Sequence, residues 1–479
     1  MHCERYALSL FTVCTLMLYI LIGYILLIFG VAFYKRKAGN EAFFVAERKS
    51  DWGMVAFGML GASISGISFI SVPGMEPSSG FSYMQLVLGF SLGYIIVAKL
   101  LLPLYYKLNL TNIYEYLSLR HGKASYRTAS LFFILSRGLG AAARLYISTY
   151  LLYEFIFAEM GIPFFAVAIF MVVFMYIYTS ASGIQTLVKT DVIQTFFLFA
   201  ALIILLVLTY NQLGESHALD LSKETFIITD WAAQNNFLKY IISGIFITVC
   251  MTGLDQDMMQ KNLTCKTLKD AQKNMLSYGF MFIPINFLFL LLGFLLAALY
   301  GASAVALPIE NDMLLPHAIQ SGLLPEVAKY IFIIGIISAT FSSADSTFVS
   351  LTTTISTTFC SSKTKENETL YTKYRKTIHL FVAIFFILML MVFYTTKNEN
   401  MIDLLFRLAS YTYGPLLGLF ALSMFTKIQI KDKFSPLICT ISPIICVIIQ
   451  VLSGNSLGYE LLLLNGFITF VGLMLIRRK

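Results

Sequence analysis

The chain has 479 residues, of which 58% are hydrophobic and 13% are charged, and its formal net charge is +8. Soluble domains carry about 25% charged residues, so the composition excludes a soluble protein and predicts an integral membrane protein. Long apolar runs without alternation favour helices over a barrel, because backbone in hydrocarbon must satisfy its own hydrogen bonds. Loop positions explain the positive charge better than a nucleic-acid partner does. The seven cysteines have no paired spacing and predict neither a disulfide framework nor a zinc site.

Thirteen apolar segments have the length of about 20 residues that a membrane-spanning helix needs. They cover residues 8–34, 54–72, 83–106, 128–157, 162–180, 190–210, 237–255, 275–300, 330–357, 377–395, 402–425, 436–453 and 458–476. The first segment is longer than the core of a signal peptide, which has about 7 to 15 residues, so we expect it to remain as a membrane anchor. The loops are too short for a separate soluble domain, and residues 1–479 are expected to form one all-α membrane domain.

Basic residues alternate between the two sides of this arrangement. The loops after the odd-numbered segments, together with the C-terminus, hold 25 of the 34 Lys and Arg residues, whereas the opposite side holds 4. Cytoplasmic loops accumulate Lys and Arg. The N-terminus is therefore predicted outside and the C-terminus in the cytoplasm, in a multi-pass protein of the plasma membrane or, in a bacterium, of the inner membrane.

The ninth segment carries a polar cluster at its centre. The cluster consists of Ser338, Thr340, Ser342, Ser343, Asp345 and Ser346. Polar groups at membrane depth are costly and usually functional. Hydroxyl and carboxylate oxygens are hard ligands that can replace the water shell of a small cation, so this helix is predicted to hold an ion.

Two other segments have interrupted patterns. In segment 54–72, Gly61, Gly66 and several serines precede Pro73, and segment 237–255 ends in the polar run 252–257. Gly and Ser in the middle of a span favour local unwinding, which frees backbone carbonyls, although they also serve close helix packing. Weakened helices five segments apart indicate an inverted repeat of five plus five helices with a binding site between them.

Five stretches of the chain resemble the sodium/solute symporter family, which includes the sodium/galactose, sodium/proline and sodium/sialic acid symporters. They are GASISGISFISVPG (61–74), SGIQTLVKTDVIQ (182–194), DQDMMQKNLTCKTLKDAQK (255–273), ATFSSADSTF (339–348) and SYTYGPLLGLF (410–420). The resemblance implies a LeuT-like core in which residues 54–210 and 237–425 form two inverted repeats. One extra helix (8–34) precedes this core and two (436–476) follow it. It also implies sodium-coupled symport of a small organic solute into the cell by alternating access, with no enzymatic activity.

The resemblance further implies a sodium site between the first and eighth core helices. Its ligands on this chain would be the backbone carbonyls of Gly61, Ile64 and Ala339 and the hydroxyls of Ser342 and Ser343. The two hydroxyls come three and four positions after Ala339 and therefore share a helix face with it. In the alternative interpretation, these serines only donate to carbonyls of their own helix.

Some members of the family hold a second sodium. The matching positions here are Asp191, Ser342 and Ser346, but Asp345 stands where those members have a further serine. Asp191 and Asp345 could instead pair with cations or relay protons. A second departure is Lys261, which follows Gln260 where the family usually has Arg; lysine keeps the charge and loses the bidentate geometry.

The solute is expected near the two helix interruptions. The resemblance assigns to it Ser65, Ser68, Gln85, Arg144, Asp255, Asp257, and Tyr411 or Tyr413. Arg137 and Arg144 are seven residues apart and lie on nearly the same helix face, about 10.5 Å apart along the axis. Arg presents a fork of donors that matches a carboxylate, so one interpretation is that one of the two binds an anionic solute. Alternatively, either arginine pairs with an internal Asp or extends its charge toward the membrane surface.

Other functions remain as alternatives to sodium symport. A proton-coupled transporter would have the same helices, and a transporter-like sensor would need an output domain that the sequence does not contain. The five histidines are dispersed, which argues against catalysis. The protein is expected to work in the lipid bilayer as a monomer.

Overall fold

A computed structural model describes residues 2–34, 39–158, 160–180, 182–214, 221, 224–233, 235–396, 401–454, 457–458 and 460–478, with the backbone alone at 2–15, 362 and 401–408. Within these ranges the regular elements are helices, and two isolated bridges join Ser50 to Cys265 and Ile430 to Arg477. The prediction of an all-α protein is confirmed.

The helices of the first half are α1 (His2–Phe33), α2 (Asn40–Val45), α3 (Trp52–Ser63), α4 (Gly66–Ser79), α5 (Tyr83–Ile96), α6 (Leu102–Lys107), α7 (Glu115–Arg120), α8 (Lys123–Leu152), α9 (Phe164–Thr179) and α10 (Ile184–Leu213). Those of the second half are α11 (Phe237–Thr248), α12 (Gln256–Asn262), α13 (Leu268–Gly301), α14 (Leu314–Gln320), α15 (Val327–Phe359), α16 (Ser362–Glu366), α17 (Glu368–Thr396), α18 (Met401–Phe425), α19 (Ser435–Leu452) and α20 (Glu460–Leu475). Three π-helical turns continue longer helices: η3 (Val97–Leu101), η4 (Tyr153–Phe157) and η6 (Val249–Gly253).

Many of these helices can cross a membrane. Among the described residues, eight helical stretches have the length and hydropathy of a span, and the bent pair Phe237–Gly253 and Gln256–Asn262 would make a ninth. Three shorter apolar helices are α3, α9 and α20. The helix α3 is short because the predicted span 54–72 is divided by a break. The chain is thus a multi-pass helical membrane protein.

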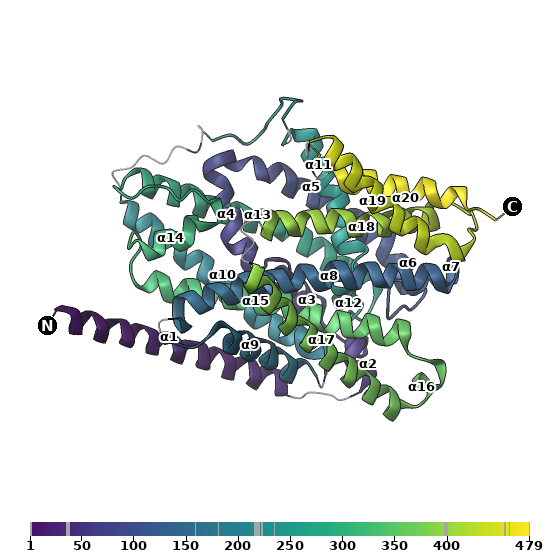
Figure 1. Cartoon of the computed structure of the whole chain (residues 1–479), viewed down its shortest axis with the longest axis horizontal. Helices are drawn as coiled ribbons and strands as arrows, with labels where there is room; N and C mark the ends of the chain where they lie inside the picture. Colours follow the sequence, from purple (N-terminus) through teal and green to yellow (C-terminus); the bar gives the residue numbers. More distant parts are fainter. Residues whose placement is uncertain are drawn as a thin grey trace.

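The helices around the predicted ion site lie in the middle of the molecule. Figure 1 shows α1 and α9 along one side and α18, α19 and α20 on the other, with α3, α10, α12 and α15 between them. The helix α10 packs against α15 and α3, and α15 also packs against α8. The polar cluster of the ninth predicted segment lies on α15 and is buried.

The first break separates α3 from α4, as the glycines and serines predicted. Ile64 (φ −90°, ψ 94°) and Ser65 (φ −76°, ψ 168°) are extended, and the Ser65 side chain caps α4 by accepting from the Ser68 amide. Gly66 brings the start of α4 close to its neighbours, because a Cβ atom there would lie 2.2 Å from Oγ of Ser148 on α8. The helix α4 continues beyond the predicted end of this span, through Pro73, to Ser79.

The second break lies between η6 and α12, where the chain bends by 70°. Asp255 caps α12, since its side chain accepts from the amides of Asp257 and Met258. The carbonyls freed here are occupied: the Tyr105 hydroxyl donates to the Gly253 oxygen at 2.8 Å, and the Tyr114 hydroxyl donates to the Leu254 oxygen at 2.9 Å. This break is therefore closed by hydrogen bonds from the region of α6 and α7.

Candidate functional site

The first break lies against α10, which connects it to the polar part of α15. A Cβ atom on Gly61 would lie 2.1 Å from Oγ1 of Thr195, and one on Gly58 would lie 2.8 Å from Cβ of Asp191. On the α15 side, the Ser342 hydroxyl donates to Oδ1 of Asp191 at 3.0 Å. The segment around Gly61 and the hydroxyl of Ser342 thus flank one turn of α10.

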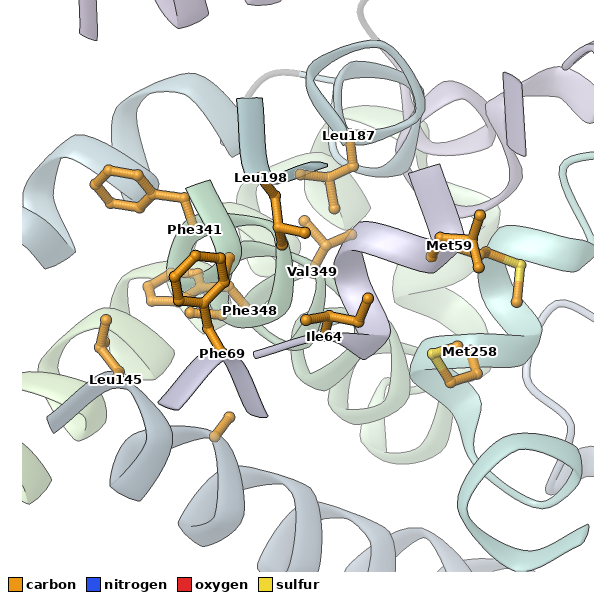
Figure 2. Close-up of a cluster of buried hydrophobic side chains, with 14 of the residues drawn as sticks. Met59, Ile64, Phe69, Leu145, Leu187, Leu198, Met258, Phe341, Phe348 and Val349 are labelled. Atoms are coloured by element: carbon orange, nitrogen blue, oxygen red, sulfur yellow. The ribbon is translucent and has the colours of Figure 1, made fainter. Parts of the chain in front are cut away.

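Backbone oxygens at the first break are open. Among the described residues, neither the Gly61 carbonyl nor the Ile64 carbonyl accepts a hydrogen bond. Figure 2 shows Ile64, at the break, and Phe69, in α4, in a cluster of buried apolar side chains that also includes Phe341 and Phe348 of α15. Unpaired carbonyls in such surroundings are unfavourable without a partner, in contrast to the closed second break.

The predicted α15 ligands are buried beside this break. Ala339 and Ser342 are 0% exposed, and Ser343 is 6% exposed. The Ser343 hydroxyl donates to the Thr340 carbonyl at 3.1 Å, which is the hydrogen bond that the alternative interpretation expects. That bond uses only the hydroxyl hydrogen, and the lone pairs of the oxygen remain available to a cation.

Asp191 is neutralised by a lysine. Its Oδ2 lies 2.7 Å from Nζ of Lys261, and the two side chains are 1% and 2% exposed. Lys261 is the residue that stands where the family usually has Arg, and it follows Gln260, whose amide donates to the Phe44 carbonyl and the Thr353 hydroxyl. Two alternative roles were expected for Asp191, pairing with a cation or relaying protons. In this structure Asp191 pairs with a cation, Lys261.

The other residues predicted for a second sodium are directed elsewhere. The Ser346 hydroxyl donates to Oδ2 of Asp257 at 3.2 Å. Oδ2 of Asp345 accepts from the Tyr178 hydroxyl at 2.5 Å, and its Oδ1 has no hydrogen-bond partner in the described part of the chain. Asp191, Ser346 and Asp345 therefore each have a different hydrogen-bond partner.

Arg137 belongs to a buried charge network. Its Nη2 lies 2.7 Å from Oδ2 of Asp257, and its Nε lies 3.6 Å from Oδ2 of Asp255. The Tyr413 hydroxyl donates to the same Asp255 oxygen at 2.5 Å. For Arg137 the structural alternative is therefore correct, and Asp255, Asp257 and Tyr413 are held in its network.

Arg144 lines a cavity of about 120 Å³ between α3, α5, α8, α11, η6, α12 and α13, and Arg137 lines the same cavity. No described carboxylate lies within 4.0 Å of the Arg144 guanidinium. Across the cavity wall, the Ser63 hydroxyl lies 2.6 Å from that of Tyr278, which lies 2.9 Å from that of Tyr94. The cavity thus combines an unpaired cation with a row of hydroxyls. Tyr413 lines a second cavity, which shares Phe90, Ile247 and Met251 with the first.

Several residues predicted for the solute lie away from these cavities. Gln85 uses its amide to hold the 224–236 region, donating to the Ser82 and Asn235 carbonyls and accepting from the Ile228 amide. The hydroxyls of Ser65 and Ser68 lie 3.4 Å apart, and neither these serines nor Tyr411 lines either cavity.

Sequence reasoning missed Ser63, Tyr94 and Tyr278. The signal for the tyrosines was a phenol in the middle of an apolar span, which must find a hydrogen-bond partner when buried.

The chain is similar over most of its length to known sodium/solute symporters. A family model described as "Sodium:solute symporter family" matches residues 43–431. The sodium/sialic acid symporter of Proteus mirabilis (strain HI4320) is 25% identical over 433 residues, covering 85% of this chain and 84% of the relative. That of Aliivibrio fischeri (strain ATCC 700601 / ES114) is 25% identical over 420 residues, covering 83% and 80%. A solved Na⁺-coupled sialic acid symporter, in a substrate-bound outward-open state, matches with a TM-score of 0.80 at 20% identity, covering 96% of this chain and 97% of that one. This last likeness establishes the fold.

Proposed function

The chain belongs to the sodium:solute symporter family, and we propose that it carries a small organic anion into the cell together with sodium. Sodium-coupled symport is the activity of the family, and its curated relatives are transporters. Sodium is therefore the coupling ion. Beyond sodium coupling, we propose that the solute is an anion, which residues bind the sodium ion, and how many spans the chain has and in which orientation.

The open carbonyls at the first break are the observation that carries the ion site. Sodium prefers several hard oxygen ligands in place of its water shell. Five oxygens are proposed for it: the carbonyls of Gly61, Ile64 and Ala339 and the hydroxyls of Ser342 and Ser343. The partnerless Gly61 and Ile64 carbonyls support this choice over the second break, where two tyrosines occupy the freed carbonyls.

The unpaired guanidinium of Arg144 supports an anionic solute. A cation that faces a cavity without a counter-ion attracts a carboxylate, which can accept two parallel hydrogen bonds from it. The hydroxyls of Ser63, Tyr94 and Tyr278 would then face the uncharged part of the solute. Sialic acid, which the two bacterial relatives are named for, is such a hydroxylated carboxylate.

For the whole chain we propose thirteen spans, with the inverted repeats at 54–210 and 237–425. Breaks in α3–α4 and in η6–α12, five predicted spans apart, support an inverted repeat. The N-terminus would lie outside and the C-terminus in the cytoplasm, as the loop charges favour. A single chain contains both the ion site and the cavity, which supports function as a monomer in the bilayer.

Transport follows alternating access, in which sodium binds one state of the protein more tightly than the other. Uptake into proteoliposomes tests both the coupling and the solute class. Radiolabelled sialic acid, monocarboxylates, neutral sugars and neutral amino acids are offered with external sodium or with choline at fixed pH. We expect sodium to accelerate uptake of at least one carboxylate.

Two results would contradict this. Uptake that is equally fast in choline would overturn the ion site. Sodium-dependent uptake of uncharged solutes alone would overturn the anionic solute and leave sodium coupling in place.

A further inference from the structure

Lys261 places a positive charge in the middle of the protein. Its Nζ lies 2.7 Å from Oδ2 of Asp191, with both side chains almost fully buried. The second oxygen of the same carboxylate, Oδ1, accepts from the Ser342 hydroxyl at 3.0 Å. Both oxygens of Asp191 are thus engaged, one by an ammonium group and one by a hydroxyl of the proposed sodium site.

The ammonium group is held firmly in this position. Lys261 lies near the end of α12, the short helix that follows the second break. The preceding residue, Gln260, fixes α12 by donating to the Phe44 carbonyl at 2.8 Å and to the Thr353 hydroxyl at 2.9 Å. A buried charge requires a partner, and Asp191 is the carboxylate within ion-pair distance of this lysine among the described residues.

A mobile cation would meet repulsion at the same carboxylate. Two positive charges near each other in a buried site repel strongly, because the surrounding dielectric is low. Of the neighbouring groups predicted for a second metal ion, Ser346 donates to Asp257, and Oδ2 of Asp345 accepts from Tyr178, while Oδ1 of Asp345 has no hydrogen-bond partner among the described residues. The position beside Asp191 is therefore filled by a cation that belongs to the protein.

We propose that Lys261 is a tethered cation that takes the place of a second sodium ion, so that each transport cycle carries one sodium. This inference rests on the proposed sodium site at the first break. Because the ammonium is covalently attached, it can pair with Asp191 and separate from it as the protein changes state, without crossing the membrane. Lys261 then determines the ion stoichiometry rather than the choice of solute.

Equilibrium binding of ²²Na⁺ to the purified full chain tests the stoichiometry with the metal alone. The wild-type protein should bind one ion per chain with a Hill coefficient near one. Lys261→Met removes the charge and keeps most of the apolar stem, which leaves the Asp191 carboxylate for a metal ion, so it should bind two. Lys261→Arg keeps the tethered charge and is the matched control, with one ion expected.

If Lys261→Met does not fold, the ion count of the wild-type protein still decides the inference, and a charge-balanced variant shows whether the single sodium needs Asp191. The double variant Lys261→Met with Asp191→Asn leaves no unpaired buried charge at this pair, and it should bind one ion.

Four results would overturn the inference in distinguishable ways. Two ions on the wild-type protein would exclude the tethered cation and leave sodium coupling intact. One ion on folded Lys261→Met would show that the lysine does not exclude a second sodium. A folded double variant that binds no ion would make Asp191 a ligand of the single sodium. A wild-type protein that binds no ion would overturn the proposed sodium site itself.

Discussion

Arg137 and Arg144 lie on nearly the same face of α8 and have different surroundings. Arg137 is neutralised by Asp257 at 2.7 Å. Both arginines line the cavity, but Arg144 has no described carboxylate within 4.0 Å. Seven residues along one helix thus separate an arginine that stabilises the fold from one that is available to a ligand.

We predict that Arg144→Gln raises the KM for a carboxylate solute about 10- to 100-fold, because a hydrogen bond to a charged group contributes about 1.5 to 3 kcal/mol. The KM of Arg144→Lys should lie between those of Arg144→Gln and the wild type, since lysine keeps the charge without the planar fork. Initial rates of sodium-driven uptake give the KM. An unchanged KM in Arg144→Gln would remove this residue from the solute site.

Arg137→Gln is the matched control for this experiment. It leaves the buried Asp257 without its cation, and breaking a buried pair costs about 3 to 5 kcal/mol. Thermal unfolding in detergent should therefore show a clear loss of stability for Arg137→Gln and little for Arg144→Gln. Equal losses would mean that Arg144 also has a structural partner.

The two serines of the proposed sodium site can be tested in the same way. Ser342→Ala with Ser343→Ala removes two of five proposed oxygens, so the sodium concentration for half-maximal uptake should rise about tenfold or more, which corresponds to about 1.4 kcal/mol or more. The KM for the solute at saturating sodium should change much less. Ser350→Ala is the control, because Ser350 is also buried on α15 and its hydroxyl donates to the Thr347 carbonyl at 3.0 Å. Sodium dependence that the double variant leaves unchanged would exclude the site.

The sequence predicts the roles and partners of some residues better than those of others. The sequence predicted a function for the α15 hydroxyls, because polar groups in the middle of an apolar span are costly and usually functional. The partner of Arg137 was not, since Asp257 is 120 residues away along the chain. Gln85 was predicted for the solute, yet its amide bonds to Asn235 and Ile228, which depends on the path of a loop that no local pattern determines.

Both interruptions were predicted from Gly, Ser and Asp in apolar segments, and both are present. Which break keeps its carbonyls open was not predictable, because Tyr105 and Tyr114 reach the second break from a distant part of the sequence. The composition of a segment therefore predicts an unwound turn, and the neighbouring helices decide whether that turn can bind an ion.

Gly66 offers a test of the first break. A Cβ atom there would lie 2.2 Å from Oγ of Ser148 and 2.8 Å from Oγ1 of Thr340, so Gly66→Ala should separate α4 from α8 and α15. We expect a loss of about 1 to 3 kcal/mol from overpacking, together with a smaller stabilisation of the protein by sodium. Thermal unfolding with and without sodium measures both effects.

Gly23→Ala is the corresponding control. Gly23 lies in α1, and a Cβ atom there would meet nothing within 4 Å. This variant should keep the wild-type response to sodium and be as stable as the wild type or slightly more stable. A Gly66→Ala protein that behaves like Gly23→Ala would show that the break tolerates a side chain and does not depend on the close approach.

At the scale of the whole molecule, the proposed odd number of spans places the two termini on opposite sides of the membrane. Reporter fusions check this directly: a fluorescent protein at the C-terminus should be bright in the cytoplasm, and alkaline phosphatase at the same position should be inactive. An N-terminal tag should be accessible from outside in intact cells. Two termini on one side would contradict thirteen spans.

Hydropathy and loop charge were sufficient for the helical class and for most helix positions, since apolar length determines which segments enter a bilayer. The arrangement of the helices depends on packing between distant segments. Figure 1 shows α1 on one side of the molecule and α19 and α20 on the other, and no local pattern in these segments predicts that placement.

The pairing of Lys261 with Asp191 also bears on the energy source for uptake. A lysine that stays in the protein adds nothing to the charge delivered to the cytoplasm. One sodium travelling with one monovalent anion is electroneutral, so accumulation would depend on concentration gradients alone. A second sodium would make the cycle electrogenic and couple it to membrane voltage, at about 2.3 kcal/mol per 100 mV. A single buried ammonium group would thus remove the membrane voltage as a driving force for accumulation.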